Sequence, residues 1–180
     1  MTHYQKPNLN VWKFGWGLWK YPANWPGNIK HIFRCIKWSF QRIVRGYCDF
    51  DVWDLDSYYC DLIHNSLLEL RDTTHGFPYD LDEKTWSAWL TETADCFYKG
   101  NEGNNAFTNP YEEEMSKLHE KWTSEEMPDG CVRLKTNYTP EDEQISQLYF
   151  DVEKENAMKR KLSINHGLQR LAARWHDLWD

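Results

Sequence analysis

The first 48 residues contain no aspartate or glutamate, although the chain of 180 residues carries 28 acidic side chains. The lysines and arginines of this stretch therefore have no acidic residue within it. The remaining residues combine 13 basic with 28 acidic side chains, so a basic N-terminal part precedes a strongly acidic body. Such a part suits phosphates, lipid head groups or an acidic protein, but we favour its docking onto the acidic body of the same chain.

Long apolar runs are also missing. No stretch approaches the roughly 18 consecutive apolar residues of a spanning helix, and mean hydropathy is -0.83. The start of the chain lacks the apolar core and small-residue cleavage site of a secretory signal. We therefore expect no membrane span and a cytoplasmic location. The five cysteines are odd in number and contain no CxxC pair, which predicts reduced thiols rather than disulfides or a zinc ribbon.

Proline and glycine are scarce and unevenly placed. The chain has 7 prolines and 9 glycines, and several of each lie within residues 1–27. There they interrupt or weaken any helix, so we predict an extended, aromatic-rich arm over residues 1–27. Residues 28–180 then form a helical body, and residues 1–180 are long enough to make one domain with its own core.

Within the body, apolar residues recur at the spacing of α-helices. Asn109-Pro110 and Thr139-Pro140 each place a capping residue before a proline at the first helical position. Residues 123–138 are predicted to be a connector that is slightly extended near its middle. We expect an all-α, mainly helical and compact domain of about five or six helices. The predicted segments are 28–46, 51–72, 80–100, 109–122 and 139–178, the last being one long helix or two helices separated by a charged stretch.

All candidate binding residues except His75 lie at the end of the first predicted helix or just after it, in the segment RGYCDFDVWDLDSY. The same residues also suit a structural role, with Arg45 pairing with Asp49 or Asp56, Gly46 turning the chain and Trp53 filling the core. A basic face on the first helix is a second candidate. The candidate binding residues are Arg45, Asp49, Asp51, Trp53, Asp56, Tyr58 and His75, and the basic face consists of Lys30, Arg34, Lys37 and Arg42.

No catalytic motif accompanies these residues: the sequence contains no GxSxG, Walker loop, GxGxxG, EF-hand or HExxH pattern. We therefore assign no catalytic residue, no metal ligand and no cofactor. Two alternatives stay open. One is a nucleotide-signal binder with Arg45 on a phosphate and Trp53 or Tyr58 stacking on a base. The other is a metal-dependent hydrolase built on Asp49, Asp54, Asp56 and His75, although aspartates at a helix start are expected from capping alone.

The stretch from Gln41 to Pro78 resembles a group of small tailed-bacteriophage proteins that share an RGxxDxDxWxLDxY segment and a later HGYP-like turn. The resemblance implies a phage origin and residence inside a bacterium, and it transfers no catalytic residue. Phe77 stands where a tyrosine is more usual. The matching residues here are Arg45, Gly46, Asp49, Asp51, Trp53, Leu55, Asp56, Tyr58, His75, Gly76 and Pro78.

These observations favour a non-enzymatic phage accessory protein that binds and modulates a host protein. A counter-defence inhibitor of the anti-CRISPR kind is one form of such a function. The hypothesis depends on the uneven charge and on the missing catalytic signature. Nucleic acid is a weaker choice of partner, because the acidic body repels phosphates. A homodimer is compatible with the same features.

Overall fold

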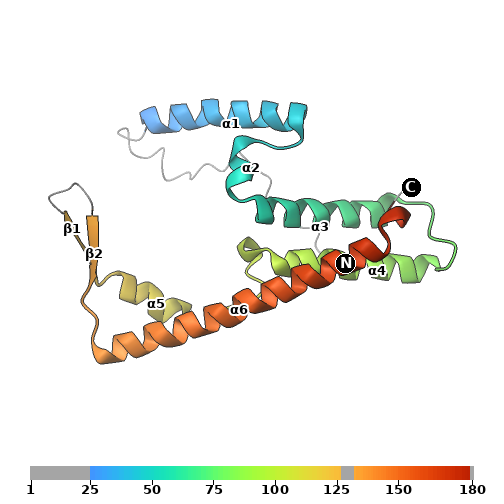
Figure 1. Cartoon of the computed structure of the whole chain (residues 1–180). Helices are drawn as coiled ribbons and strands as arrows, with labels where there is room; N and C mark the ends of the chain where they lie inside the picture. Colours follow the sequence, from blue (N-terminus) through green and yellow to red (C-terminus); the bar gives the residue numbers. More distant parts are fainter. Residues whose placement is uncertain (1–24, 127–131, 179–180) are drawn as a thin grey trace.

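The computed structural model describes residues 25–126 and 132–178 (Figure 1). Within these ranges the chain forms six α-helices, the two 3-10 turns η3 (Glu102–Asn104) and η4 (Trp175–Asp177), and one two-stranded sheet. The chain is mainly α-helical, which confirms the predicted class and number of helices. No helix in these ranges is long and apolar enough to cross a bilayer. Residues 1–24 of the predicted arm lie outside the described residues.

Helix α1 (Trp25–Arg45) begins before Asn28, so the boundary that we placed after residue 27 is wrong. Pro26 lies in its first turn, where the N–H that proline lacks has no partner within a helix anyway. As predicted, Gly46 ends the helix. Its φ of 82° turns the chain, a conformation that only glycine adopts without strain. Its N–H donates to the carbonyl oxygen of Arg42 at 2.9 Å.

The predicted helix 51–72 is in fact two helices, α2 (Asp49–Trp53) and α3 (Leu55–Thr73). The break falls at Asp54, whose φ of -133° and ψ of 54° lie outside the helical region. Figure 1 shows that α2 turns away from the axis of α3 and lies between α1 and α3. The physical reason for the break is that side chains of α2 are bound to α1, so α2 cannot continue along the axis of α3.

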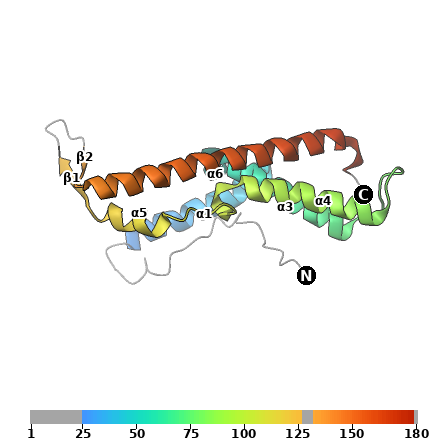
Figure 2. The ribbon, with the colours of Figure 1, turned by 90° about the horizontal axis from the view of Figure 1, so that it is seen from below.

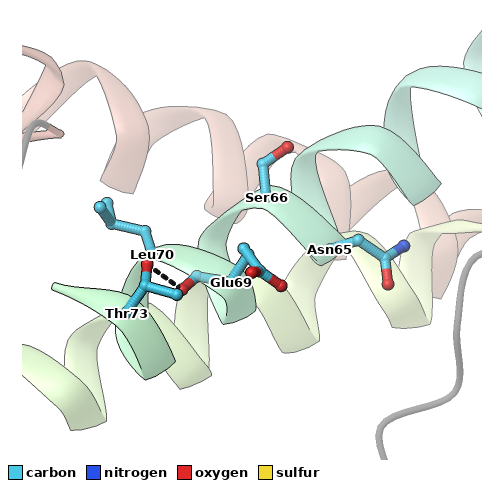
Figure 3. A pocket seen from close by; sticks show the side chains of 5 residues that line it. All are labelled: Asn65, Ser66, Glu69, Leu70 and Thr73. Carbon is cyan, nitrogen blue, oxygen red and sulfur yellow. Dashed lines mark hydrogen bonds between the residues drawn. The ribbon is translucent and has the colours of Figure 1, made fainter.

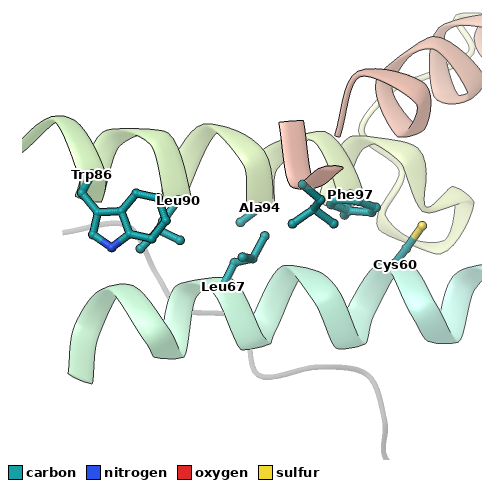
Figure 4. Close-up of a cluster of buried hydrophobic side chains, with 7 residues drawn as sticks. Cys60, Leu67, Trp86, Leu90, Ala94 and Phe97 are labelled. Carbon is teal, nitrogen blue, oxygen red and sulfur yellow. The ribbon is translucent and has the colours of Figure 1, made fainter. Parts of the chain in front are cut away.

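Helix α4 (Glu83–Gly100) runs antiparallel to α3 (Figure 1). It begins as predicted at an aspartate cap, because Asp82 Oδ1 accepts the N–H of Thr85 at 2.7 Å. The hydrophobic core lies between these two helices and is completed from α6 (Figure 4). The buried core residues are Cys60, Leu67, Trp86, Leu90, Ala94, Phe97 and Leu171.

Helix α6 (Pro140–Ala173) is continuous, which resolves the choice between one helix and two. Thr139 and Asp142 cap its start reciprocally: the Asp142 N–H donates to Thr139 Oγ1 at 3.3 Å, and the Thr139 N–H donates to Asp142 Oδ2 at 2.9 Å. Its C-terminal half packs on α4. A Cβ on Gly167 would lie 2.8 Å from Cε2 of Phe97, so the close approach of the two helices requires a glycine there.

The N-terminal half of α6 extends beyond the α3–α4 pair (Figures 1 and 2). It carries α5 (Glu112–His119) and a hairpin made of β1 (Trp122–Glu126) and β2 (Val132–Thr136). The hairpin corrects our prediction of a connector over residues 123–138.

Helix α5 ends at His119, before the predicted end at residue 122, because Trp122 belongs to a strand. The spacing of Trp122 from Leu118 suggested a helix that continues to residue 122, but Trp122 lies in β1 opposite Thr136. There its indole Nε1 donates to the hydroxyl of Tyr138 at 2.6 Å. The strand ladder and this hydrogen bond satisfy the polar groups of the segment outside a helix.

Four of the five cysteines lie in the described part, and no disulfide joins any of them there. Cys35, Cys48 and Cys60 are buried, whereas Cys96 is partly exposed. Burial raises the pKa of the Cys60 thiol to about 11. These four agree with the prediction of reduced thiols, and Cys131 lies outside the described residues.

Candidate functional site

Arg42 of α1 and Asp51 of α2 form the centre of the contact between these helices. Asp51 is only 3% exposed. Its Oδ2 accepts Arg42 Nε at 2.9 Å and the Cys48 N–H at 2.7 Å, and its Oδ1 accepts Arg42 Nη2. Burial by itself raises the pKa of the Asp51 carboxyl, but these hydrogen bonds outweigh it and keep the pKa below its usual value. The buried charge is therefore fully paired, as its burial demands.

Asp49 provides a second, exposed link between α1 and α2. Its Oδ2 lies 2.6 Å from Lys37 Nζ, and its Oδ1 lies 3.8 Å from Arg45 Nη1. Its backbone N–H donates to Gln41 Oε1 at 3.1 Å. The hydrogen bond from Lys37 lowers the pKa of the Asp49 carboxyl. Because both side chains are exposed, the pair contributes little to stability.

Tyr58 connects α3 to the end of α1. Its hydroxyl donates to the carbonyl oxygen of Gly46 at 2.5 Å, and the guanidinium of Arg42 lies 5.7 Å from the centre of its ring. Together with Asp49 and Asp51, these residues form what we call the joint: Arg42, Gly46, Asp49, Asp51 and Tyr58. Four of the five belong to the motif noted in the sequence, so much of that motif has a structural role.

The other candidate residues lie outside the joint. Trp53 is 91% exposed, so the expectation that it fills the core is wrong. Asp56 is exposed on the first turn of α3. His75 follows the last turn of α3, which places it roughly 25 Å from Asp56 at 1.5 Å per helical residue. The length of α3 therefore separates His75 from Asp56 and from the start of that helix.

The positions of these residues bear on the two alternative functions, the metal-dependent hydrolase and the nucleotide-signal binder. The hydrolase set of Asp49, Asp54, Asp56 and His75 is not assembled, and no group of three or more metal-binding side chains gathers anywhere in residues 25–126 and 132–178. For the nucleotide binder, the Tyr58 ring that would stack on a base already lies 5.7 Å from the Arg42 guanidinium, and the other stacking candidate, Trp53, lies exposed outside the joint. Neither chemistry gains support from the geometry.

A cysteine–histidine contact that the sequence did not reveal lies between α4 and α6. Cys96 Sγ is 3.7 Å from His166 Nδ1. Burial raises the pKa of the Cys96 thiol, which disfavours the thiolate that a nucleophile requires. We therefore assign it no catalytic role.

Two hollows flank α3. The first, of about 440 Å³, is wide open and is lined by one face of α3 alone (Figure 3). The second, of about 330 Å³, lies beside the segment that follows α3 and includes Arg71 and His75 in its lining. Arg71 is already bonded to Asp72 at 2.7 Å and to Thr91 at 3.2 Å. The first hollow is too open to enclose a ligand. The second has polar side chains in its lining, Thr74, Glu83 and Ser87 among them, but nothing in the structure identifies a ligand for it, so we assign it none.

The most unusual surface of the molecule is one side of α1. Its side chains are between 49% and 82% exposed. The joint lies on the opposite side of the helix, where Trp38 packs on Phe50 with ring centres 5.2 Å apart. Contiguous exposed apolar surface of this kind marks an interaction site. We call it the apolar face of α1; it consists of Ile29, Phe33, Ile36, Phe40, Ile43 and Val44.

The four residues of the predicted basic face of α1 have two different environments. Lys37 and Arg42 contact Asp49 and Asp51. Lys30 and Arg34 are exposed, and the described part of the chain shows no ion pair for either. The sequence indicated a basic amphipathic helix, but only the structure shows that the helix turns its apolar side outward.

The described part of the chain is mainly α-helical. The joint holds its amphipathic helix α1 and leaves the apolar face of that helix exposed. Comparison of the chain with protein-family models, with curated proteins and with solved structures finds no match in any of the three. The argument for function therefore depends on the geometry of α1.

Proposed function

We propose that this chain is a non-enzymatic accessory protein of a phage, like the small tailed-bacteriophage proteins whose motif it resembles. In this proposal it binds and modulates a protein of the host cell. The observation that supports the proposal is the apolar face of α1. Figure 1 shows that α1 lies at the upper edge of the molecule, away from the α3–α4–α6 core. A partner can therefore reach this face without displacing the core.

The free energy gained by covering the apolar face of α1 is of the size expected for a docking surface. Full burial of one Ile, Val or Phe side chain is worth about 1.5–3 kcal/mol, and the six side chains are already about half buried or less. Covering the face then yields on the order of 6–11 kcal/mol. Association itself costs about 4–15 kcal/mol, so α1 alone supports weak binding. A tight complex also needs charged contacts or an anchor such as the exposed Trp53.

The joint reduces the cost of binding. Asp51 and Arg42 hold α1 against α2, and Tyr58 ties the end of α1 to α3. A partner therefore meets a helix that is already formed and oriented, which saves the entropy of ordering it. In this proposal the motif residues of the joint position the docking helix and do not contact the partner.

The experiment is capture of host proteins from bacterial lysate with the tagged full-length chain. Three versions are compared: wild type, the double variant Phe33→Gln/Phe40→Gln on α1, and Phe150→Gln on α6. Phe150 is 50% exposed, so it is a matched control of the same residue type on another helix.

We expect one defined host protein to be retained by wild type and by Phe150→Gln but not by the α1 variant. Expression in the host should change growth or phage plating in the same pattern. If no host protein distinguishes the three versions and none of them affects the host, the proposal fails.

A further inference from the structure

The hairpin of β1 and β2 presents both of its faces to solvent. Every side chain that the structure describes on these strands is exposed, Trp122 to 40% and Leu134 to 61%. A hairpin of two strands is only marginally stable in water, and a third strand with a shared apolar face makes such a sheet stable. The hairpin therefore has the open edges and the uncovered face that an extended segment can join.

The two faces of the hairpin differ in character. Trp122 and Leu134 lie on the same face, because Leu134 stands opposite Ser124, two positions along β1 from Trp122. The other face carries charge, and Lys135 Nζ there lies 2.5 Å from Glu125 Oε2. Since successive side chains of a strand point to opposite faces, a segment that completes the apolar face needs an apolar residue at every second position.

The N-terminal arm contains a segment with this pattern, in a part of the chain outside the described residues. Apolar residues alternate there with lysine or glycine, in the order Trp12, Lys13, Phe14, Gly15, Trp16, Gly17 and Leu18. Alternation over four to eight residues is typical of a strand with one apolar face. Within residues 25–126 and 132–178 the sheet has no third strand. The arm therefore offers four apolar side chains that match the uncovered face.

The arm is attached where it can reach the hairpin. It leads into Trp25, the first residue of α1, and both views show the start of α1 at the end of the molecule that carries the hairpin (Figures 1 and 2). Residues 19–24 can bridge up to roughly 20 Å when extended. A tethered segment acts at a high effective concentration, which favours the arm over a separate molecule.

Charge favours the free edge of β1 over that of β2. Residues 12–18 carry Lys13 and no acidic residue. β2 carries Lys135 and also Arg133, for which the described part of the chain shows no ion pair. β1 carries no basic residue. Lys13 would therefore lie beside like charge on β2 but not on β1, and like charges that face each other across strands are destabilising.

A second copy of the hairpin is a poorer fit to these edges. Pairing β2 with β2 brings two basic strands together, and pairing β1 with β1 brings two acidic strands together. Pairing β1 of one copy with β2 of the next avoids this repulsion but leaves a free edge at each end, so that it continues without closing.

We infer that residues 12–18 of the N-terminal arm add to the free edge of β1 as a third strand, with their four apolar side chains on the face of Trp122 and Leu134. This inference is independent of the proposed function, because it concerns the arm and the hairpin and leaves the apolar face of α1 uncovered.

The test is hydrogen exchange of the full-length protein, read by mass spectrometry. Wild type is compared with Leu134→Gln on β2, with Phe14→Ser/Trp16→Ser in the arm, and with the control Leu162→Gln. Leu162 lies on α6 and is 59% exposed, close to the 61% of Leu134, so the control matches in residue type and exposure. Each protein is measured at a low and a high concentration, because pairing between copies depends on concentration.

We expect the amides of residues 12–18 to exchange at least about tenfold more slowly than in an unstructured peptide, in wild type and in Leu162→Gln. Leu134→Gln should remove this protection. Phe14→Ser/Trp16→Ser should remove it too and should also lower the protection of β1. Helices α3 and α4 should stay protected in every variant, which shows that the body is folded.

Three results would each overturn the inference. The first is free exchange of residues 12–18 in wild type. The second is protection of the arm that Leu134→Gln leaves unchanged, which would place the arm on another surface. The third is protection that appears only at the high protein concentration, which would assign the hairpin edge to a second copy.

Discussion

The hydroxyl of Tyr58 in the first turns of α3 donates to the carbonyl oxygen of Gly46, the residue that ends α1. This hydrogen bond closes the corner made by α1, α2 and α3. It lies at the edge of the contact whose buried centre is the Arg42–Asp51 pair. The orientation of α1, and with it the outward direction of the apolar face, therefore depends on a few polar contacts together with the packing of Trp38 on Phe50.

Replacing Tyr58 with Phe should lower the free energy of unfolding by about 1 kcal/mol, the usual net value of one hydrogen bond. Urea unfolding followed by circular dichroism measures this. Tyr59→Phe is the matched control, because the described structure shows no hydrogen bond from the neighbouring hydroxyl. Equal effects of the two substitutions would contradict the role of the Tyr58 bond.

Asp51→Asn should be more damaging. It removes the charge that neutralises Arg42, and leaving one member of a largely buried pair uncompensated costs about 3 kcal/mol. Asp56→Asn changes another aspartate of the same motif, but that residue is exposed at a helix start, where a charge is worth less than about 1 kcal/mol. Thermal and urea unfolding of both variants should separate them clearly. A loss for Asp56→Asn as large as that for Asp51→Asn would count against the joint.

The pH dependence of the free energy of unfolding should reveal the contribution of the Arg42–Asp51 pair. The pKa of Asp51 is lowered in the folded state, so its contribution is fully present above the unfolded value of about 4 and is lost as the pH falls through the folded pKa. The stability difference between wild type and Asp51→Asn should therefore shrink as the pH is lowered below about 4. Urea unfolding at a series of pH values measures it, and a constant difference down to about pH 2 would refute the assignment.

Gly167 should tolerate no larger residue. A Cβ there would lie 2.8 Å from Phe97 Cε2 and 3.0 Å from Cys96 Cβ, so Gly167→Val forces α6 away from α4 at a cost of about 2–3 kcal/mol. A Cβ on Gly76 would meet nothing within 4 Å, and Gly76→Val should change stability by less than about 0.5 kcal/mol. Similar unfolding midpoints for the two variants would show that the α4–α6 packing is not as close as described.

Helix positions were largely predictable because they depend on local patterns. Asp82 and Thr139 are capping residues, and both start helices where the sequence indicated. Gly46 ends α1 because its left-handed backbone is cheap only for glycine. The break at Asp54 and the placement of Trp122 in a strand were missed, since both depend on contacts with residues distant in the sequence.

The candidate site was predictable only in part. The sequence singled out Asp51 but could not show that Arg42 would bury it. Trp53 was expected in the core because tryptophan is a large apolar residue, yet the turn at Asp54 leaves it exposed. The pattern of α1 revealed an apolar side, but which way that side faces depends on the joint, a tertiary feature.

The most direct test of the docking surface compares stability with binding in one variant. Phe33→Gln/Phe40→Gln should keep its free energy of unfolding within about 1 kcal/mol of wild type, as expected for exposed positions, and should lose capture of the host protein. Phe97→Ala, which truncates a core side chain, should lose about 3–5 kcal/mol. If instead the α1 variant is destabilised as severely as Phe97→Ala, its phenylalanines belong to the core of the folded chain and the apolar face is not a docking surface.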